Sequence, residues 1–150
     1  LLIIGEGSYK AELKKIVESL KISSYVEFLG AMPHNKLVYY YNLADVFVLP
    51  SITSKIGTEG LGLVILEAMA AKVPVIGTNT GGVRYTIKKN ENGILVEEKN
   101  SEELANAVAL LLSNGKFREK IVRNAYKFVH ENYSWNVVVK KFDNLYEKIK

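Results

Sequence analysis

Short apolar runs alternate along the chain with segments of helical periodicity. The runs predict five strands, over residues 1–4, 25–30, 45–50, 73–78 and 92–97. Apolar positions three and four residues apart predict helices over residues 8–21, 34–44, 61–71, 83–89, 101–112, 116–131 and 134–148. Nearly continuous apolar strands that alternate with helices are typical of a parallel sheet covered on both faces. The predicted fold class is therefore α/β, a Rossmann-like doubly wound parallel sheet.

The composition narrows the possible chemistry. The chain has 150 residues, about one domain's worth, and contains no Cys, which excludes a disulfide framework, a zinc–thiolate site and a thiol nucleophile. No apolar run is long enough to span a membrane, and no signal-peptide pattern is present. We therefore expect a cytoplasmic location. The chain opens without Met inside an apparent strand, so we also expect it to be a piece of a longer protein.

The net charge of +4 comes mainly from Lys and Arg residues near the C-terminus, where they alternate with apolar residues. This pattern is typical of a solvated helix face. It also allows peripheral association with an anionic membrane surface or with a phosphorylated ligand. No recognition motif for nucleic acid accompanies the charge, so nucleic acid is not an expected partner.

Three glycine-bearing loops follow predicted strands, over residues 5–10, 58–63 and 78–83. In an open parallel sheet such loops meet at the carboxyl edge, where ligands bind. Gly5 and Gly7 of the first loop are therefore candidate ligand-binding residues, although glycines at helix starts also serve close packing. Convergence of the three loops on one edge is the stronger signal.

The loop "TEGLGL" has the features of an anion site. Gly60 and Gly62 leave backbone N–H groups unobstructed at the start of a helix, where the unpaired donors and the helix dipole favour a phosphate. No Gly-Lys-Ser/Thr follows, so it is not a Walker loop. The first loop lacks the third glycine of the dinucleotide fingerprint.

Two acidic residues, Glu59 and Glu67, lie on either side of this helix start. An ionised carboxylate only accepts hydrogen bonds, so it repels phosphate and suits hydroxyl groups. A nucleotide sugar would match this spacing, with its diphosphate at the helix tip and its sugar and ribose hydroxyls at the two acids. Alternatively, Glu59 is a helix-dipole partner and Glu67 is a surface residue paired with a Lys.

We expect no metal cofactor. The chain has only two Asp, Asp45 and Asp143, and they form no Asp-x-Asp pair that could hold a divalent ion on a diphosphate. Its two His, His34 and His130, are too few and too far apart in the sequence for a zinc site.

The segments "ADVFVLPS", "EGLGLVILEAMAAKVPVIGTNTGG" and "NENGILVE" together resemble the donor-binding half of the retaining glycosyltransferases of family four, also called glycosyl transferases group 1. The resemblance covers nearly the whole chain. Its centre is the family's E-x7-E element, here Glu59 to Glu67. It implies the C-terminal half of a GT-B fold.

The resemblance also implies residue roles. Glu59 would be the catalytic-site acid that contacts the donor sugar, and Glu67 would hold the ribose hydroxyls. The other residues that it places against the donor are Leu61, Gly62 and Leu63, near the sugar and diphosphate, and Ala31 and Met32, near the base. The helix after Trp135 would cross back to pack on a partner domain.

The chain departs from the family in four respects. The Arg and Lys that neutralise the diphosphate lie upstream of Leu1 in the family, and so does the N-terminal acceptor domain. Arg84 and Tyr85 stand where the family usually has Pro-Glu. The link "SITSKIGTEG" is longer than usual, which predicts an unusual wall for the sugar pocket.

Residues 1–150 are thus identified as the nucleotide-sugar-binding domain of a retaining, metal-independent glycosyltransferase. The donor would be a UDP-sugar or GDP-sugar, used as co-substrate in glycan, lipid or polysaccharide biosynthesis, and the isolated chain would be inactive. The acceptor, a sugar or a lipid-linked sugar, would bind the missing domain. Two alternatives stay open: a sugar-nucleotide epimerase or hydrolase on the same fold, and a non-catalytic binding module.

Overall fold

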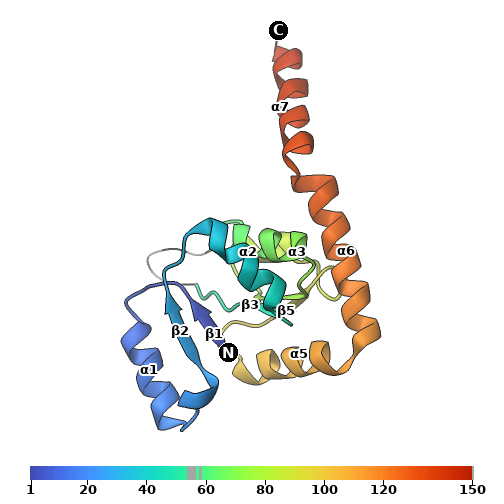
Figure 1. The fold of residues 1–150 in the computed structure, drawn as a ribbon. Coiled ribbons are helices and arrows are strands. Elements are labelled where there is room, and N and C mark those ends of the chain that lie inside the picture. The colour runs from blue at the N-terminus through green and yellow to red at the C-terminus, as the bar shows by residue number, and fades with distance from the viewer. Residues whose placement is uncertain (54–56, 58, 150) are drawn as a thin grey trace. The chain divides into compact units, whose positions relative to one another are not determined.

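The computed structural model describes residues 1–53, 57 and 59–149. The chain divides into two compact units, Leu1–Tyr40 and Tyr41–Lys150, each described here by itself. The predicted α/β class is confirmed, because helices alternate with strands (Figure 1) and the strand pairs of the described residues are parallel.

The first unit contains a two-stranded parallel sheet. Its elements are β1 (Leu2–Ile4), α1 (Lys10–Ser19), the 3-10 turn η1 (Ser23–Tyr25), β2 (Glu27–Gly30) and the first part of α2 (His34–Leu43). Leu2 pairs with Glu27, and Ile3 pairs with Phe28. The strand predicted from residue 25 begins at Glu27 instead, because the preceding residues turn into η1.

The second unit contains a three-stranded parallel sheet of order β3-β4-β5. Its elements after α2 are β3 (Phe47–Leu49), α3 (Leu63–Ala70), β4 (Val75–Thr78), α4 (Val83–Thr86), β5 (Ile94–Val96), α5 (Ser101–Ser113), α6 (Gly115–Tyr133) and α7 (Trp135–Ile149). The central strand, β4, is buried along its whole length. Its position between two parallel neighbours explains the continuous apolar run that predicted it.

Both faces of this second sheet are covered. Ile76 of β4 packs in one cluster with Leu111 of α5. The next residue, Gly77, faces the opposite way, and a Cβ added there would meet Val83 and Ile87 at 2.6 and 2.8 Å. Neighbouring strand residues point to opposite faces, so α5 covers one side while α3 and α4 cover the other. Figure 1 labels α3 and α5.

Two predicted helix boundaries shift for local reasons. The helix expected from residue 61 begins at Leu63, because Gly62 takes a left-handed conformation with φ of 69°. The helix expected to reach residue 89 ends at Thr86, whose carbonyl is bonded by the Asn92 side chain. The Asn92 side chain accepts a hydrogen bond from the Lys88 N–H and donates one to the Thr86 carbonyl.

The C-terminal helices differ in burial. α6 is capped by Asn114, whose side chain accepts a hydrogen bond from the Phe117 N–H, and the helix buries Ile121, Ala125 and Val129. α7 has no buried residue, and Trp135 at its start is 82% exposed. The expectation that this last helix packs on a partner domain stays a prediction.

Candidate functional site

The carboxyl edge of the second sheet gathers three loops. β3 leads into the segment that contains Glu59, β4 into the turn that contains Gly81 and Gly82, and β5 into Glu97 and Glu98. Because the three strands are parallel, these loops lie at the same edge. This edge is the place where open parallel sheets bind ligands.

The N-terminus of α3 opens directly from this edge. Gly62 is buried and its φ of 69° favours glycine, and a Cβ added there would lie 3.0 Å from the end of the Ile65 side chain. Its carbonyl accepts the first turn's hydrogen bond from the Ile65 N–H at 2.8 Å. Leu61 and Leu63, on either side of Gly62, are 39% and 63% exposed, so the start of this helix lies at the surface of the unit. This helix end has the dipole and donors that suit an anion.

The β4–α4 turn fixes the backbone around Glu59. The Gly82 N–H donates to the Glu59 carbonyl at 2.9 Å. The Thr86 hydroxyl donates to the Leu61 carbonyl at 2.8 Å. A Cβ on Gly82 would lie only 1.4 Å from the Gly60 carbonyl oxygen, so the two loops are packed backbone to backbone. The double glycine therefore positions the segment that carries the first acid.

Glu67 lies in the middle of α3 and is half-buried, with Leu66 and Ala68 buried on either side of it. One of its oxygens, Oε2, accepts a hydrogen bond from the Tyr41 hydroxyl at 2.9 Å. Tyr41 is 7% exposed. Burial, followed by the hydrogen bond and charge of Glu67, raises the pKa of Tyr41 well above its ordinary value, so this hydroxyl remains a donor.

Sequence reasoning did not identify Tyr41. A usable signal was present, because an acid on an otherwise apolar helix needs a buried donor and residues 39–41 are three consecutive tyrosines. Which of the three faces Glu67 depends on how α2 packs, since Tyr39 is 70% exposed and Tyr41 is buried.

A second polar cluster ties together the segments after β3, β4 and β5. Glu98 accepts hydrogen bonds from the Thr53 N–H at 2.7 Å and from the Thr53 hydroxyl at 2.6 Å. The Thr80 hydroxyl lies 2.8 Å from that of Thr53. The hydrogen bonds from Thr53 are the main reason why the pKa of Glu98 is lowered. The Thr78 hydroxyl also donates to the Ser51 carbonyl, so the start of the long link is anchored on the sheet.

The predicted unusual pocket wall falls largely on residues 54–56 and 58, which lie outside the described residues. The described ends of this link are Ser51–Thr53 and Glu59–Gly60, and Leu61 follows directly. Both ends are held by contacts with the second sheet or with the turns that leave it.

The remaining predicted residues belong to the first unit and share one edge of its sheet. Gly5 ends β1 with φ of 130° and donates a hydrogen bond to the Gly30 carbonyl at 2.8 Å. Gly7 follows in the same loop and is exposed. Ala31 and Met32 follow β2, the first exposed and the second half-buried. These four residues therefore follow the carboxyl ends of β1 and β2 in the first unit, and the two acids belong to the second unit.

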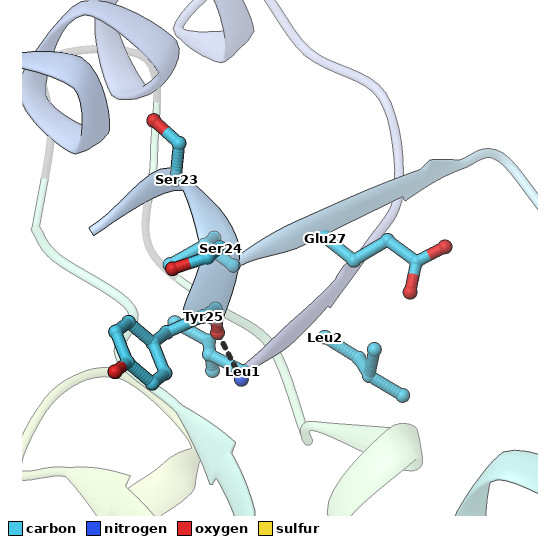
Figure 2. Close-up of a pocket in the computed structure, with 7 residues that line it drawn as sticks. Leu1, Leu2, Ser23, Ser24, Tyr25 and Glu27 are labelled. Carbon is cyan, nitrogen blue, oxygen red and sulfur yellow. Dashed lines mark hydrogen bonds between the residues drawn. The ribbon is translucent and has the colours of Figure 1, made fainter. Parts of the chain in front are cut away.

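A pocket of about 400 Å³ lies elsewhere in the first unit (Figure 2). Its lining residues are Leu1, Leu2, Ser23, Ser24, Tyr25, Val26 and Glu27. These residues surround the amino ends of β1 and β2, where the Leu1 amino group donates to the Tyr25 carbonyl at 2.7 Å. Within the first unit, the pocket is thus at the opposite end of β1 and β2 from the loops that carry Gly5, Gly7, Ala31 and Met32.

Within the described ranges, no group of three or more His, Asp or Glu side chains is close enough together to hold a metal ion. None of the helices in that part of the chain combines the length and apolar character of a membrane span. That the reaction needs no metal stays a prediction.

Residues 1–128 match the sequence profile of the family described as glycosyl transferases group 1. An uncharacterized glycosyltransferase of Methanocaldococcus jannaschii is 40% identical over 147 residues, which is 98% of this chain and 36% of that protein. A GDP-mannose-dependent alpha-(1-6)-phosphatidylinositol monomannoside mannosyltransferase of Mycobacterium tuberculosis is 34% identical over 143 residues, which is 94% of this chain and 37% of that protein. The chain therefore spans about a third of the length of these curated relatives.

Solved structures of glycosyltransferases are also similar to this chain. The C-terminal domain of a glycosyl transferase group 1 family protein, LpcC of Francisella tularensis, has a TM-score of 0.74 at 35% identity, covering 85% of this chain and 63% of that one. A mutant of TarM from S. aureus, in complex with fondaparinux, alpha-GlcNAc-glycerol and UDP, has a TM-score of 0.78 at 28% identity, covering 96% of this chain and 28% of that one.

Proposed function

The chain belongs to the group 1 glycosyltransferases, and from this premise we propose that it is the part that binds a nucleoside-diphosphate sugar. The transfer it serves is retaining and metal-independent, and the acceptor is a glycan, a lipid or a growing polysaccharide. The acceptor is held by a preceding domain. The whole enzyme works in the cytoplasm, free or at the membrane surface.

One observation carries the proposal. Two acidic residues, Glu59 before α3 and Glu67 within it, accompany a helix start at the carboxyl edge of a parallel sheet, and both belong to the same compact unit. The helix end suits the diphosphate, because its donors and dipole favour an anion. The acids suit hydroxyl groups, because ionised carboxylates only accept hydrogen bonds. Glu59 thus faces the donor sugar, and Glu67 faces the ribose.

The relatives support the class of donor. The mycobacterial relative is GDP-mannose-dependent by its name, and the TarM structure contains UDP. GDP and UDP are both nucleoside diphosphates, so they share a ribose and a diphosphate. The elements that we assign to binding, Glu67 and the start of α3, address those shared parts. The sugar is a hexose, and its identity is read by the loop around Glu59.

The chemistry expected of this chain is positioning and electrostatic stabilisation. As the bond to the sugar breaks, negative charge grows on the departing diphosphate. The N–H groups at the start of α3 stabilise that charge without reorganising. Glu59 holds the sugar in the geometry for attack on the same face that the diphosphate leaves. Cations that complete the neutralisation come from a segment that precedes Leu1.

A thermal-shift panel tests the proposal. The 150-residue chain is heated with UDP, GDP, ADP, UDP-glucose and GDP-mannose, each at several concentrations. A ligand present at a hundredfold excess over its Kd stabilises the fold by about 2.7 kcal/mol, so a true donor gives a concentration-dependent rise in Tm. Inorganic pyrophosphate is the control for simple anion binding. A panel in which no nucleotide exceeds pyrophosphate contradicts the proposed function.

A further inference from the structure

Tyr41 is built rigidly into the second unit. Its ring is 7% exposed and meets the Phe47 ring edge-on, with centroids 5.7 Å apart at an interplanar angle of 65°. Phe47 is the first residue of β3 and pairs with Val75 of the central strand. The Tyr41 ring therefore packs against the start of β3.

The residue that this hydroxyl contacts is one of the two candidate acids. Glu67 Oε2 accepts its hydrogen bond at 2.9 Å across 26 residues of sequence. A Glu side chain has several rotamers to lose on binding a ligand, whereas the buried Tyr41 ring has already lost its own. A carboxylate offers about four acceptor positions, so the bond from Tyr41 is compatible with further bonds from a ligand.

The Tyr41 hydroxyl also keeps the same protonation state. Burial and the adjacent Glu67 carboxylate raise the pKa of Tyr41, so the hydroxyl keeps its proton throughout the range in which enzymes work. A hydrogen bond from a neutral hydroxyl restrains one oxygen of the Glu67 carboxylate without placing a further charge beside it. The geometry thus favours one orientation of this carboxylate.

We propose that Tyr41 is a positioning residue of the donor site: its hydroxyl holds the Glu67 carboxylate in the orientation that receives the ribose hydroxyls. The proposal rests on the proposed function, because it takes Glu67 as the ribose acceptor. Tyr41 itself does not contact the nucleotide. Its effect on binding passes entirely through Glu67.

The test compares ribose recognition in four proteins. These are the parent chain, Tyr41→Phe, Glu67→Ala and the double variant. Tyr39→Phe is the matched control, since it removes the same hydroxyl from the same helix at a side chain that is 70% exposed. Calorimetry measures Kd for UDP and GDP, each beside its 2′,3′-dideoxy form. The readout is the ratio of the two affinities, which a general loss of stability does not change.

The parent should prefer the ribonucleotide roughly tenfold to a hundredfold, the effect expected for hydrogen bonds to a charged group, and Glu67→Ala should abolish this preference. Tyr41→Phe should reduce the preference about threefold to tenfold and leave the dideoxy affinity unchanged. The double variant should lose no more than Glu67→Ala. Tyr39→Phe should behave as the parent does.

The outcomes separate the two proposals. If the parent and Glu67→Ala behave as expected but Tyr41→Phe keeps the full preference, the positioning role is wrong and the donor site stands. If the parent shows no preference, the ribose assignment fails and the role of Tyr41 fails with it. Should Tyr41→Phe not fold, Phe47→Leu keeps the hydroxyl but loosens the ring, and an unchanged preference in that variant also overturns the proposal.

Discussion

The two acids are held in different ways. Glu59 is fixed through its backbone, whose carbonyl accepts the Gly82 N–H, whereas Glu67 is fixed through its side chain by Tyr41. An acid positioned by its main chain keeps side-chain rotamers, which suits a group that must follow a sugar through a reaction. An acid restrained at its carboxylate suits an unchanging part of the ligand, such as ribose.

This difference leads to a prediction for Glu59. Removing its carboxylate should erase the advantage of a nucleotide sugar over the bare nucleotide and leave the affinity for the bare nucleotide unchanged. Loss of a charged acceptor corresponds to about 1.5–3 kcal/mol, or roughly tenfold to a hundredfold in Kd. Calorimetry of Glu59→Ala with UDP, UDP-glucose, GDP and GDP-mannose measures it, with Glu119→Ala on α6 as a charge control. Equal losses for sugar and bare nucleotide would contradict the assigned role.

The hydrogen bonds of Glu98 lead to a prediction about the stability of the fold at low pH. Hydrogen bonds from Thr53 lower its pKa in the folded protein relative to the ordinary value of 4.5. A group whose folded pKa is lowered stabilises the fold above its unfolded pKa, and this stabilisation is lost as the pH falls through the folded value. The anchor of the Ser51–Thr53 segment should therefore weaken below pH 4.5.

Comparing Tm of the parent with that of Glu98→Gln tests this. Above pH 4.5 the variant should melt below the parent, and the gap should narrow as the pH is lowered. Glu119→Gln controls for the loss of one exposed carboxylate elsewhere. A gap that stays constant down to the acid limit of folding would show that the Thr53 contact does not depend on ionisation.

At the scale of helices and strands, the sequence predicts most of the order of these elements, but it predicts their first and last residues less accurately. The strand over Val75–Thr78 was predictable because a buried central strand is apolar on both faces. The helix after Gly82 was predicted too long because Asn92, six residues beyond Thr86 in sequence, turns inward and donates to its carbonyl. That bond depends on the burial of a polar side chain, and periodicity carries no information about it.

The candidate site divides in the same way. Glu59, Gly62 and Glu67 could be selected from sequence, since their types and spacing lie within one loop and helix. Tyr41 could not, because its bond to Glu67 joins two helices through the packing of α2. The contact between Gly82 and the Gly60 carbonyl was equally inaccessible, because it depends on how closely two loops of the sheet edge approach.

That approach makes Gly82 a critical residue of the β4–α4 turn. Its φ of −77° is accessible to any residue, so the requirement for glycine is one of space. Gly82→Ala must push the Glu59–Leu61 segment away, which should cost about 1–3 kcal/mol as overpacking does. For a domain near this size, Tm falls by roughly 2–4 °C per kcal/mol.

Nucleotide-sugar affinity should fall in Gly82→Ala as well, because the displaced segment carries Glu59. Gly115→Ala is the matched control, since a Cβ at Gly115 meets nothing within 4 Å. Thermal melts and calorimetry with UDP-glucose and GDP-mannose measure both effects. A Gly82→Ala protein that melts and binds as the parent does would mean that the two loops do not depend on each other.

On the scale of the whole molecule, binding and transfer are expected to be separable. The acids and the start of α3 lie within one compact unit, so the groups that we assign to the sugar, the diphosphate and the ribose can be ordered by this unit. The chain nevertheless spans only 36% and 37% of the length of two glycosyltransferases that it resembles. As the family resemblance implies, we expect the acceptor site and the diphosphate-neutralising cations to lie outside these residues.

The resulting prediction is that the 150-residue chain binds a donor but neither transfers nor hydrolyses it. Without an acceptor and the upstream cations, the helix tip alone stabilises the departing diphosphate, and the barrier for bond cleavage stays high. Release of UDP from UDP-glucose and of GDP from GDP-mannose is followed by a coupled assay, with the mycobacterial mannosyltransferase, GDP-mannose and phosphatidylinositol monomannoside as the positive control. Nucleotide release by the chain alone, lost in Glu59→Ala, would instead establish a sugar-nucleotide hydrolase complete within these 150 residues.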